Sequence, residues 1–177
     1  MMPNSSERSF RHREVIPVSS SHLWKIESGY VRTVTWDMSG EVTTLGIWGT
    51  GDIVGKPLSQ LDPYQIECLT PVQASEFAFS RHQLGEVMFC HIQHLERLVN
   101  ILHTRQTSSR LLKLLEWLAQ RFGHKVDRGS VIEIRLTHQI IAEIISTTRV
   151  TVTRLLKELE RQEKLILLRK HRILLLA

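Results

Sequence analysis

The sequence is poor in cysteine, which limits the disulfide and metal chemistry that it can support. Its 177 residues include only Cys68 and Cys90, which lie far apart and form no close pair or cluster. Small secreted scaffolds instead carry many cysteines, because disulfides stabilise them. We expect both cysteines to be packing residues of a protein in a reducing compartment.

Long apolar runs are also missing. No stretch approaches the roughly 20 apolar residues that span a bilayer, and the polar residues 1–13 do not resemble a signal peptide. The hydrophobic content of 42% and the charged content of 23% are ordinary for a globular protein. We therefore expect a cytoplasmic protein that does not associate with a membrane.

Residues that would indicate an enzyme are absent as well. The sequence has no nucleophile–base pair and no glycine-rich loop that could cradle a phosphate. His91, His94 and Glu96 suggest a metal site, but three ligands would have to converge, and the polar surface of a helix is the simpler interpretation. The sequence predicts no enzymatic activity, no metal and no cofactor.

Charge is distributed unevenly along the chain. Residues 1–99 contain 8 Lys and Arg against 11 Asp and Glu, whereas residues 100–177 contain 15 against 7. A basic half beside a mildly acidic half indicates that one end of the chain meets a polyanion. The length suits one medium domain or two small ones.

Two apolar patterns of helical period follow one another between residues 136 and 159. The residues that share a face are Ile140, Ile141, Ile144 and Ile145 in the first pattern and Val152, Leu155, Leu156 and Leu159 in the second. Between the patterns lie Ser146, Thr147 and Thr148, whose hydroxyls can cap a new helix. Two short helices joined by a few residues form a helix-turn-helix.

The outward side of the second expected helix suits the major groove of DNA. It carries Arg149, Val150, Thr153, Arg154 and Lys157, with no acidic residue before Glu158. Arginine can bind guanine through two hydrogen bonds, and the methyl groups of valine and threonine can pack against thymine. A helix hairpin with a solvated basic face would show the same pattern.

The run STTRVTVTRLL from Ser146 to Leu156 resembles the DNA-binding motif of the Crp/Fnr family of bacterial transcription regulators, and most of all its cyanobacterial global nitrogen regulator branch. Residues 136–139 and 142–143 fit the same motif. The family usually has glycine at the position of Ser146, where a left-handed backbone would cost serine more than glycine.

The resemblance implies an α+β fold with three parts. These are an N-terminal β-roll of the cyclic-nucleotide-binding jelly-roll type at 1–88, with a start shorter than usual for the family, a dimerisation helix at 89–107 and a winged helix-turn-helix at 108–177. Strand patterns with turn signals between them support the roll. We expect strands at 15–18, 23–26, 30–36, 41–48, 53–55, 65–69, 72–79 and 131–136, helices at 80–88, 91–107 and 108–122, and wing strands at 165–168 and 173–176.

The resemblance also implies how DNA is bound. Arg149 and Arg154 would reach base edges, Val150 and Thr153 would influence which bases are chosen, and further residues would contact phosphates. The expected phosphate contacts are Thr148, Lys157, Arg169, Lys170 and His171. Palindromic half-sites containing GTA, as in the nitrogen-regulator branch, would be bound by a homodimer, with RNA polymerase as a further partner.

The expected dimer contact is an apolar stripe on the long helix. Such a stripe is more often part of a protein core, but a palindromic site requires two copies of the motif, which favours the dimer. The stripe consists of Ile92, Leu95, Leu98, Val99 and Leu102.

The effector is less well defined by the resemblance. Members that bind cyclic AMP have a glutamate and an Arg-Ser pair where this chain has Lys56, Tyr64 and Gln65, so cyclic AMP is not expected. Others bind iron–sulfur clusters through several cysteines, which this chain lacks. We expect an absent or unknown effector.

Two alternatives remain open. One is a regulator that responds to 2-oxoglutarate, which the nitrogen-regulator branch binds through the loop at Val54, Gly55 and Lys56 and through an arginine and a glutamate on the long helix. Glu96 matches that glutamate, but His91 replaces the arginine, and a neutral imidazole lacks the two-pronged donor that pairs with a carboxylate. The other alternative is a ligand-sensing module that does not read DNA.

Overall fold

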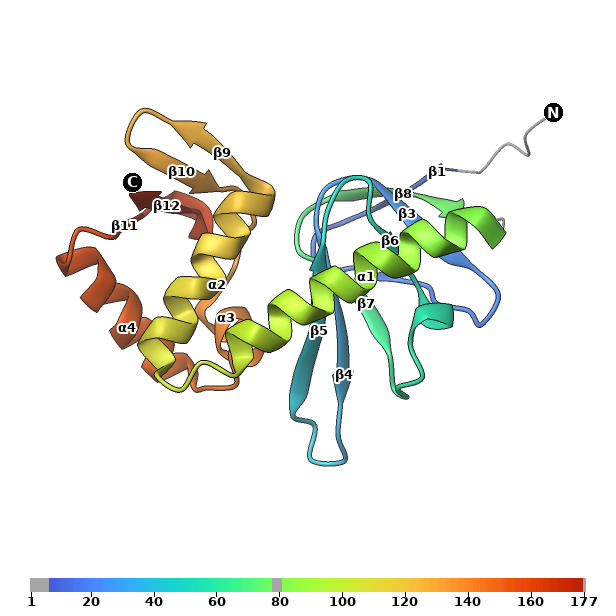
Figure 1. Cartoon of the computed structure of the whole chain (residues 1–177), viewed down its shortest axis with the longest axis horizontal. Helices are drawn as coiled ribbons and strands as arrows, with labels where there is room; N and C mark the ends of the chain where they lie inside the picture. Colours follow the sequence, from blue (N-terminus) through green and yellow to red (C-terminus); the bar gives the residue numbers. More distant parts are fainter. Residues whose placement is uncertain (1–6, 78–80, 177) are drawn as a thin grey trace. The chain divides into compact units, whose positions relative to one another are not determined.

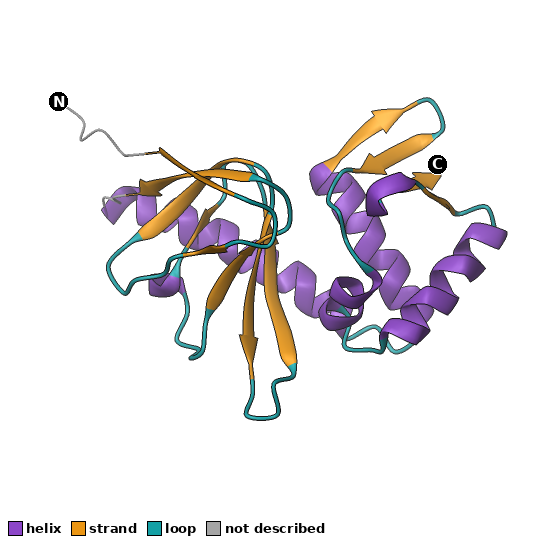
Figure 2. Cartoon of the chain, turned by 180° about the vertical axis from the view of Figure 1, so that it is seen from behind, coloured by secondary structure: helices purple, strands orange, loops and turns teal. Residues whose placement is uncertain are grey.

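The computed structural model describes residues 7–77 and 81–176, without the side chains of Arg81, His82 and Lys170. The chain forms two compact units, residues 1–97 and 98–177. The first is built mainly of strands and the second mainly of helices (Figures 1 and 2). Among the helices of the described ranges, none has the length and apolar character needed to cross a membrane.

Two antiparallel four-stranded sheets form the roll of the N-terminal unit. Their strand orders are β1-β8-β3-β6 and β2-β7-β4-β5. The strands are β1 (Glu7–Phe10), β2 (Val15–Ile16), β3 (Leu23–Ser28), β4 (Val31–Trp36), β5 (Val42–Trp48), β6 (Ile53–Val54), β7 (Gln65–Cys68) and β8 (Val72–Phe77). A short helix, η1 (Lys56–Leu58), follows β6.

Alternation of side chains along these strands fills the interior of the roll. The core contains the buried residues Phe10, Ile16, Trp24, Ile26, Val31, Trp48, Val54, Ile66, Cys68, Val72 and Ala74. The indole N–H of Trp48 donates to the hydroxyl of Thr33 at 3.0 Å, so this large side chain has no unsatisfied donor. The predicted β-roll is confirmed.

The first strand was not expected from the sequence. Strand β1 pairs with β8, and its only buried residue is Phe10, which meets the Trp24 ring edge-on at a centroid distance of 5.8 Å. The guanidinium of Arg8 lies 5.6 Å from the Trp24 ring centroid, a cation–π contact. A strand with one apolar residue among charged ones has no period-2 pattern, which explains why the sequence suggested a polar tail.

A single helix, α1 (Arg81–Leu102), replaces the two helices expected at 80–88 and 91–107. No proline interrupts this stretch, and Gly85 is tolerated within it. Ser80, the expected cap of the shorter helix, lies outside the described residues.

The apolar stripe expected along the helix is divided between two faces. Ile92, Leu95 and Val99 are exposed, whereas Leu98 is buried.

The C-terminal unit is a winged helix-turn-helix, as predicted. Its elements are α2 (Thr107–Phe122), β9 (Gly123–Val126), β10 (Gly129–Ile132), α3 (His138–Ile144), α4 (Arg149–Arg161), β11 (Leu165–Leu167), η2 (Arg169–His171) and β12 (Ile173–Leu176). The sheet order is β11-β12-β10-β9. The strand expected at 131–136 lies at Gly129–Ile132, and its partner β9, mostly exposed and polar, was not expected.

Candidate nucleic-acid interface

Helix α3 has a defined start and end. The hydroxyl of Thr137 accepts the N–H of Ile140 at 3.2 Å, which caps the first turn. At the other end Ser146 has a φ of 50°, and the N–H of Thr147 donates to the carbonyl of Ala142 at 3.0 Å. Helices commonly end in this way, with a residue of positive φ and a hydrogen bond from the next N–H to the carbonyl five residues before it. The position is therefore left-handed, as the glycine of the family motif suggested.

Replacing Ser146 by glycine should stabilise the protein. Glycine adopts a positive φ without the steric cost that a Cβ imposes, so we expect Ser146→Gly to raise the free energy of unfolding by roughly 0.5–1 kcal/mol. Denaturant unfolding would measure the change. Ser146→Ala keeps a Cβ at the same φ and should give no gain; an equal gain in both variants would contradict the explanation.

Helix α4 begins immediately after this turn. The hydroxyl of Thr148 accepts the N–H of Thr151 at 3.2 Å and caps the helix. The inward face is buried and consists of Val152, Leu155, Leu156 and Leu159. Helices α3 and α4 therefore form the predicted helix-turn-helix, and the apolar face of α4 fixes which residues point outward.

The outward face presents the residues that the sequence selected. Val150 is 78% exposed, and Arg149, Arg154 and Lys157 are also exposed. Among the described residues, no carboxylate forms an ion pair with Arg149 or Arg154, so both guanidinium groups are available to a ligand. An apolar side chain exposed between arginines is costly in water and suits contact with base edges.

Thr153 differs from the other selected residues because its hydroxyl already has two partners. It donates to the carbonyl of Arg149 at 2.9 Å and contacts Nδ1 of His138 at 2.8 Å. Sequence analysis missed His138 because helical periodicity says nothing about contacts between the start of one helix and the middle of another.

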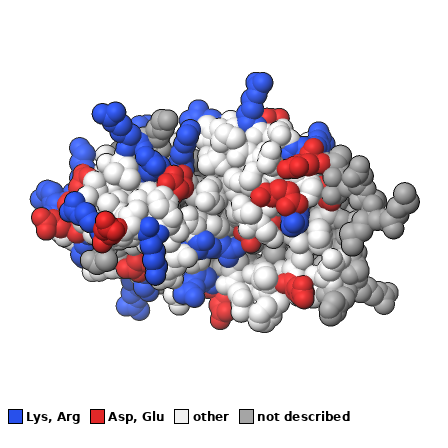
Figure 3. Space-filling view, turned by 90° about the horizontal axis from the view of Figure 1, so that it is seen from above, with Lys and Arg blue, Asp and Glu red and all other residues white. Residues whose placement is uncertain are grey.

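The wing follows α4. Strands β11 and β12 pair antiparallel, and the short helix η2 forms the tip between them. Arg169 and His171 are exposed there, and His171 has a φ of 58°; the side chain of Lys170 lies outside the described residues. Lys and Arg side chains are spread over the surface of this unit (Figure 3).

The residues considered for effector binding are already engaged within the N-terminal unit. Nζ of Lys56 donates to the carbonyl of Leu61 and lies 3.5 Å from Oδ1 of Asp62. Nε2 of His91 donates to the carbonyl of Ile53 at 2.7 Å, and its ring stacks on Trp48 at a centroid distance of 4.2 Å.

The remaining effector candidates differ in their exposure. Val54 is buried, and Glu96 is exposed. Gly55 has a φ of 157°, and a Cβ there would lie 2.9 Å from the carbonyl oxygen of His22.

Tyr64 packs against the core of the roll, beside this loop. The backbone N–H of Gly55 bonds its hydroxyl, and burial raises the pKa of Tyr64 above its ordinary value. By the resemblance, Tyr64 stands where cyclic-AMP-binding members carry a phosphate-binding residue. A bulky, neutral phenol therefore occupies this position.

Comparison with known proteins agrees with this architecture. Residues 109–177 match the Crp-like helix-turn-helix domain. The chain is 42% identical over 149 residues to the regulatory protein CysR of Synechococcus elongatus, covering 82% of this chain and 72% of CysR. The global nitrogen regulator of the same organism is 38% identical over 122 residues, covering 62% of this chain and 54% of the regulator.

Solved structures share the fold at low sequence identity. A CRP-family transcriptional regulator from Thermus thermophilus has a TM-score of 0.80 at 22% identity and covers 96% of this chain and 92% of its own. FixK2 of Bradyrhizobium japonicum has a TM-score of 0.82 at 18% identity, with 97% and 92% covered.

These relatives are regulators and not enzymes, as expected. The predicted resemblance, including that to the global nitrogen regulators, is confirmed, and the match to CysR extends over more of the chain. Together with the helix-turn-helix and its exposed basic helix, the similarity establishes that this chain belongs to the Crp/Fnr family of DNA-binding transcription regulators.

Proposed function

We propose that this protein binds palindromic DNA with GTA-type half-sites as a homodimer. The observation that carries the proposal is the exposed face of α4, where Val150 lies between Arg149 and Arg154 with no acidic partner. Arg154 and Arg149 would bind base edges, Val150 would contact a methyl group, and Thr148, Lys157 and the wing would hold phosphates.

The exposed side of α1 supports a homodimer. Met88, Ile92, Leu95 and Val99 are 49%, 59%, 46% and 53% exposed, and their spacings of four, three and four residues place them along one stripe. That spacing is the one by which paired helices bury a common seam. A second copy of α1 offers a matching stripe, and a palindrome requires two copies of α4.

We further propose that DNA binding needs neither cyclic AMP nor 2-oxoglutarate. Three contacts support this proposal: the hydroxyl of Tyr64 is bonded to Gly55, Lys56 lies beside Asp62, and His91 is held by the carbonyl of Ile53. A dicarboxylate would have to compete with the contacts that Lys56 and His91 already make. RNA polymerase is the partner that we propose at the promoter.

The test is a titration of labelled duplexes with purified protein. A GTA-containing palindrome should bind at least about a thousandfold more tightly than a scrambled duplex at the same salt concentration. Addition of 2-oxoglutarate should leave both affinities unchanged.

Two outcomes would contradict parts of this proposal. Equal affinity for the two duplexes would reject the assignment of Arg149, Val150 and Arg154 to base edges. Binding that the metabolite strengthens would instead show that Lys56, His91 and Glu96 rearrange into a carboxylate site, and would reject effector independence alone.

A further inference from the structure

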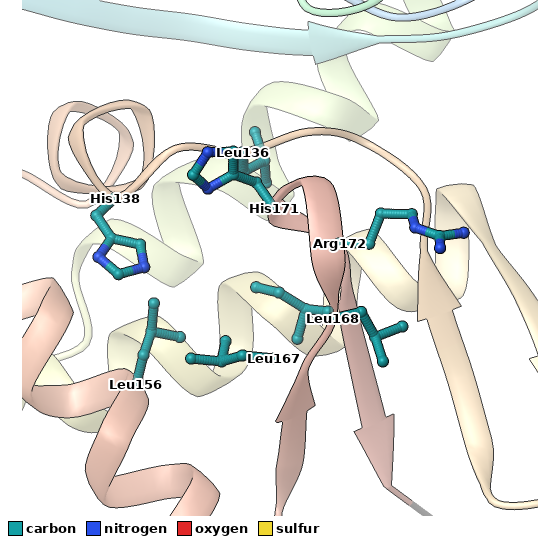
Figure 4. Close-up of a pocket in the computed structure, with 8 residues that line it drawn as sticks. Leu136, His138, Leu156, Leu167, Leu168, His171 and Arg172 are labelled. Atoms are coloured by element: carbon teal, nitrogen blue, oxygen red, sulfur yellow. The ribbon is translucent and has the colours of Figure 1, made fainter.

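A recess of about 220 Å³ lies between α3, α4 and the wing. Most of its lining is apolar, and its polar residues are His138, His171 and Arg172 (Figure 4). Arg172 extends away from His138, and its Nη1 lies 3.4 Å from Oε1 of Glu133. The two imidazoles are therefore the polar groups that face the recess.

The hydrogen bonds of Thr153 determine which nitrogen of His138 carries a proton. A hydroxyl has one proton to donate, and that of Thr153 is donated to the carbonyl of Arg149, which can only accept. The contact of 2.8 Å between Thr153 and Nδ1 of His138 must then use an Nδ1–H donor. His138 thus fixes the side chain of Thr153 on the helix that presents the DNA-binding residues.

The second nitrogen of His138, Nε2, is left without a bond to any residue of the described chain. Burial, together with the positive charges of His171 and Arg149, lowers the pKa of His138 from its ordinary value. The imidazole is accordingly neutral at neutral pH in the free protein. Of the groups that disfavour a proton on His138, Arg149 belongs to α4 and the His171 imidazole to the wing.

Bound DNA would favour protonation of His138, because phosphates close to Arg149 and the wing would surround its imidazole with negative charge. A nearby opposite charge favours the protonated imidazole and offsets the repulsion from Arg149. A proton on Nε2 also leaves the Nδ1–H bond to Thr153 intact, since both nitrogens of the cation are donors.

We propose that His138 holds Thr153 in place for base contact and takes up a proton when DNA binds, so that affinity for the site increases as the pH falls. This inference rests on the proposed function, because it requires DNA against α4 and the wing. The gain in affinity is fully present below the pKa of the free protein and disappears as the pH rises through the higher pKa of the complex.

The first test measures affinity for the GTA palindrome between about pH 5.5 and 8.5 at constant ionic strength, the range in which histidine titrates. Affinity should increase by about three- to tenfold per pH unit for each protomer that gains a proton. His138→Asn keeps an N–H donor near Thr153 but cannot titrate. This variant should therefore take up one proton fewer per protomer on binding, which makes affinity depend less steeply on pH.

Two controls separate His138 from other histidines. His171→Asn removes the other imidazole that lines the recess, and the pH dependence that remains should still require His138. His103→Asn removes an exposed histidine outside the recess and should leave the whole dependence unchanged. A folded His138→Asn variant with the same pH dependence as the unmodified protein would overturn the proposal.

A second measurement requires no substitution. Proton NMR of the His138 ring in the unmodified protein, free and with duplex DNA, should show its titration midpoint moving to higher pH in the complex. An unchanged or lower midpoint would overturn the proton uptake. Because this measurement can use a random duplex, it remains decisive when the palindrome shows no preference, so the two proposals can fail separately.

Discussion

Introducing a charge on the exposed stripe of α1 should abolish tight binding to the palindrome. We expect Ile92→Arg to convert the proposed dimer to a monomer, because two arginines would replace two apolar side chains in the seam. An unpaired charge buried in an interface costs about 3 kcal/mol or more, which reduces affinity for the palindrome by about a hundredfold or more. Analytical ultracentrifugation would measure the dimer, and duplex titration would measure the binding.

The neighbouring residue provides a matched control. Gln93 is exposed and lies off the stripe, so Gln93→Arg adds the same charge to the same helix without entering the seam. This control should remain dimeric and bind the palindrome normally. Because Ile92 is exposed within one chain, the Ile92→Arg monomer should stay folded, and an unchanged circular dichroism spectrum would confirm it. A stable Ile92→Arg dimer would reject this dimer seam.

Truncating Arg154 should remove discrimination between sequences without removing affinity for DNA in general. A guanine contact through two hydrogen bonds contributes about 1–3 kcal/mol, and a dimer on a palindrome makes it twice, so Arg154→Ala should cost about 2–6 kcal/mol on the specific duplex. Affinity for random DNA should change much less. Titration of the specific and the random duplex at the same salt concentration measures the loss of affinity for each.

Control variants at Lys157 and Arg161 distinguish the loss of a base contact from the loss of a phosphate contact. Lys157→Ala removes an expected phosphate contact and should weaken both duplexes equally, with a smaller salt dependence. Arg161 lies at the end of α4, paired with Glu158, and Arg161→Ala should have little effect on either duplex. Equal losses on the two duplexes for Arg154→Ala would show that Arg154 contacts phosphate and not a base.

The helix-turn-helix could be predicted in detail because local chemistry determines it. The apolar period, the caps at Thr137 and Thr148 and the left-handed Ser146 all lie within a continuous stretch of chain. Two features could not be predicted: strand β1, and the burial of Leu98 on a helix where Ile92 is exposed. Each depends on which distant segment of the chain packs against the residues concerned.

The same distinction applies to the candidate site. Arg149, Val150, Arg154 and Lys157 could be selected because exposure follows from the period of one helix. The bond between His138 and Thr153 joins residues from two helices, and its length depends on how those helices cross. The partners of Lys56 and His91 similarly depend on the path of loops, which the residue types do not determine.

The tyrosine in the roll has a consequence for timing. A regulator gated by a metabolite responds as quickly as a small molecule diffuses and binds. Where Tyr64 and its bond to Gly55 already complete the roll, occupancy of the promoter at a given pH would follow the synthesis and degradation of the chain. Gene expression under such a protein would respond slowly and persist after the initiating signal has ended, giving the cell a memory of its recent state.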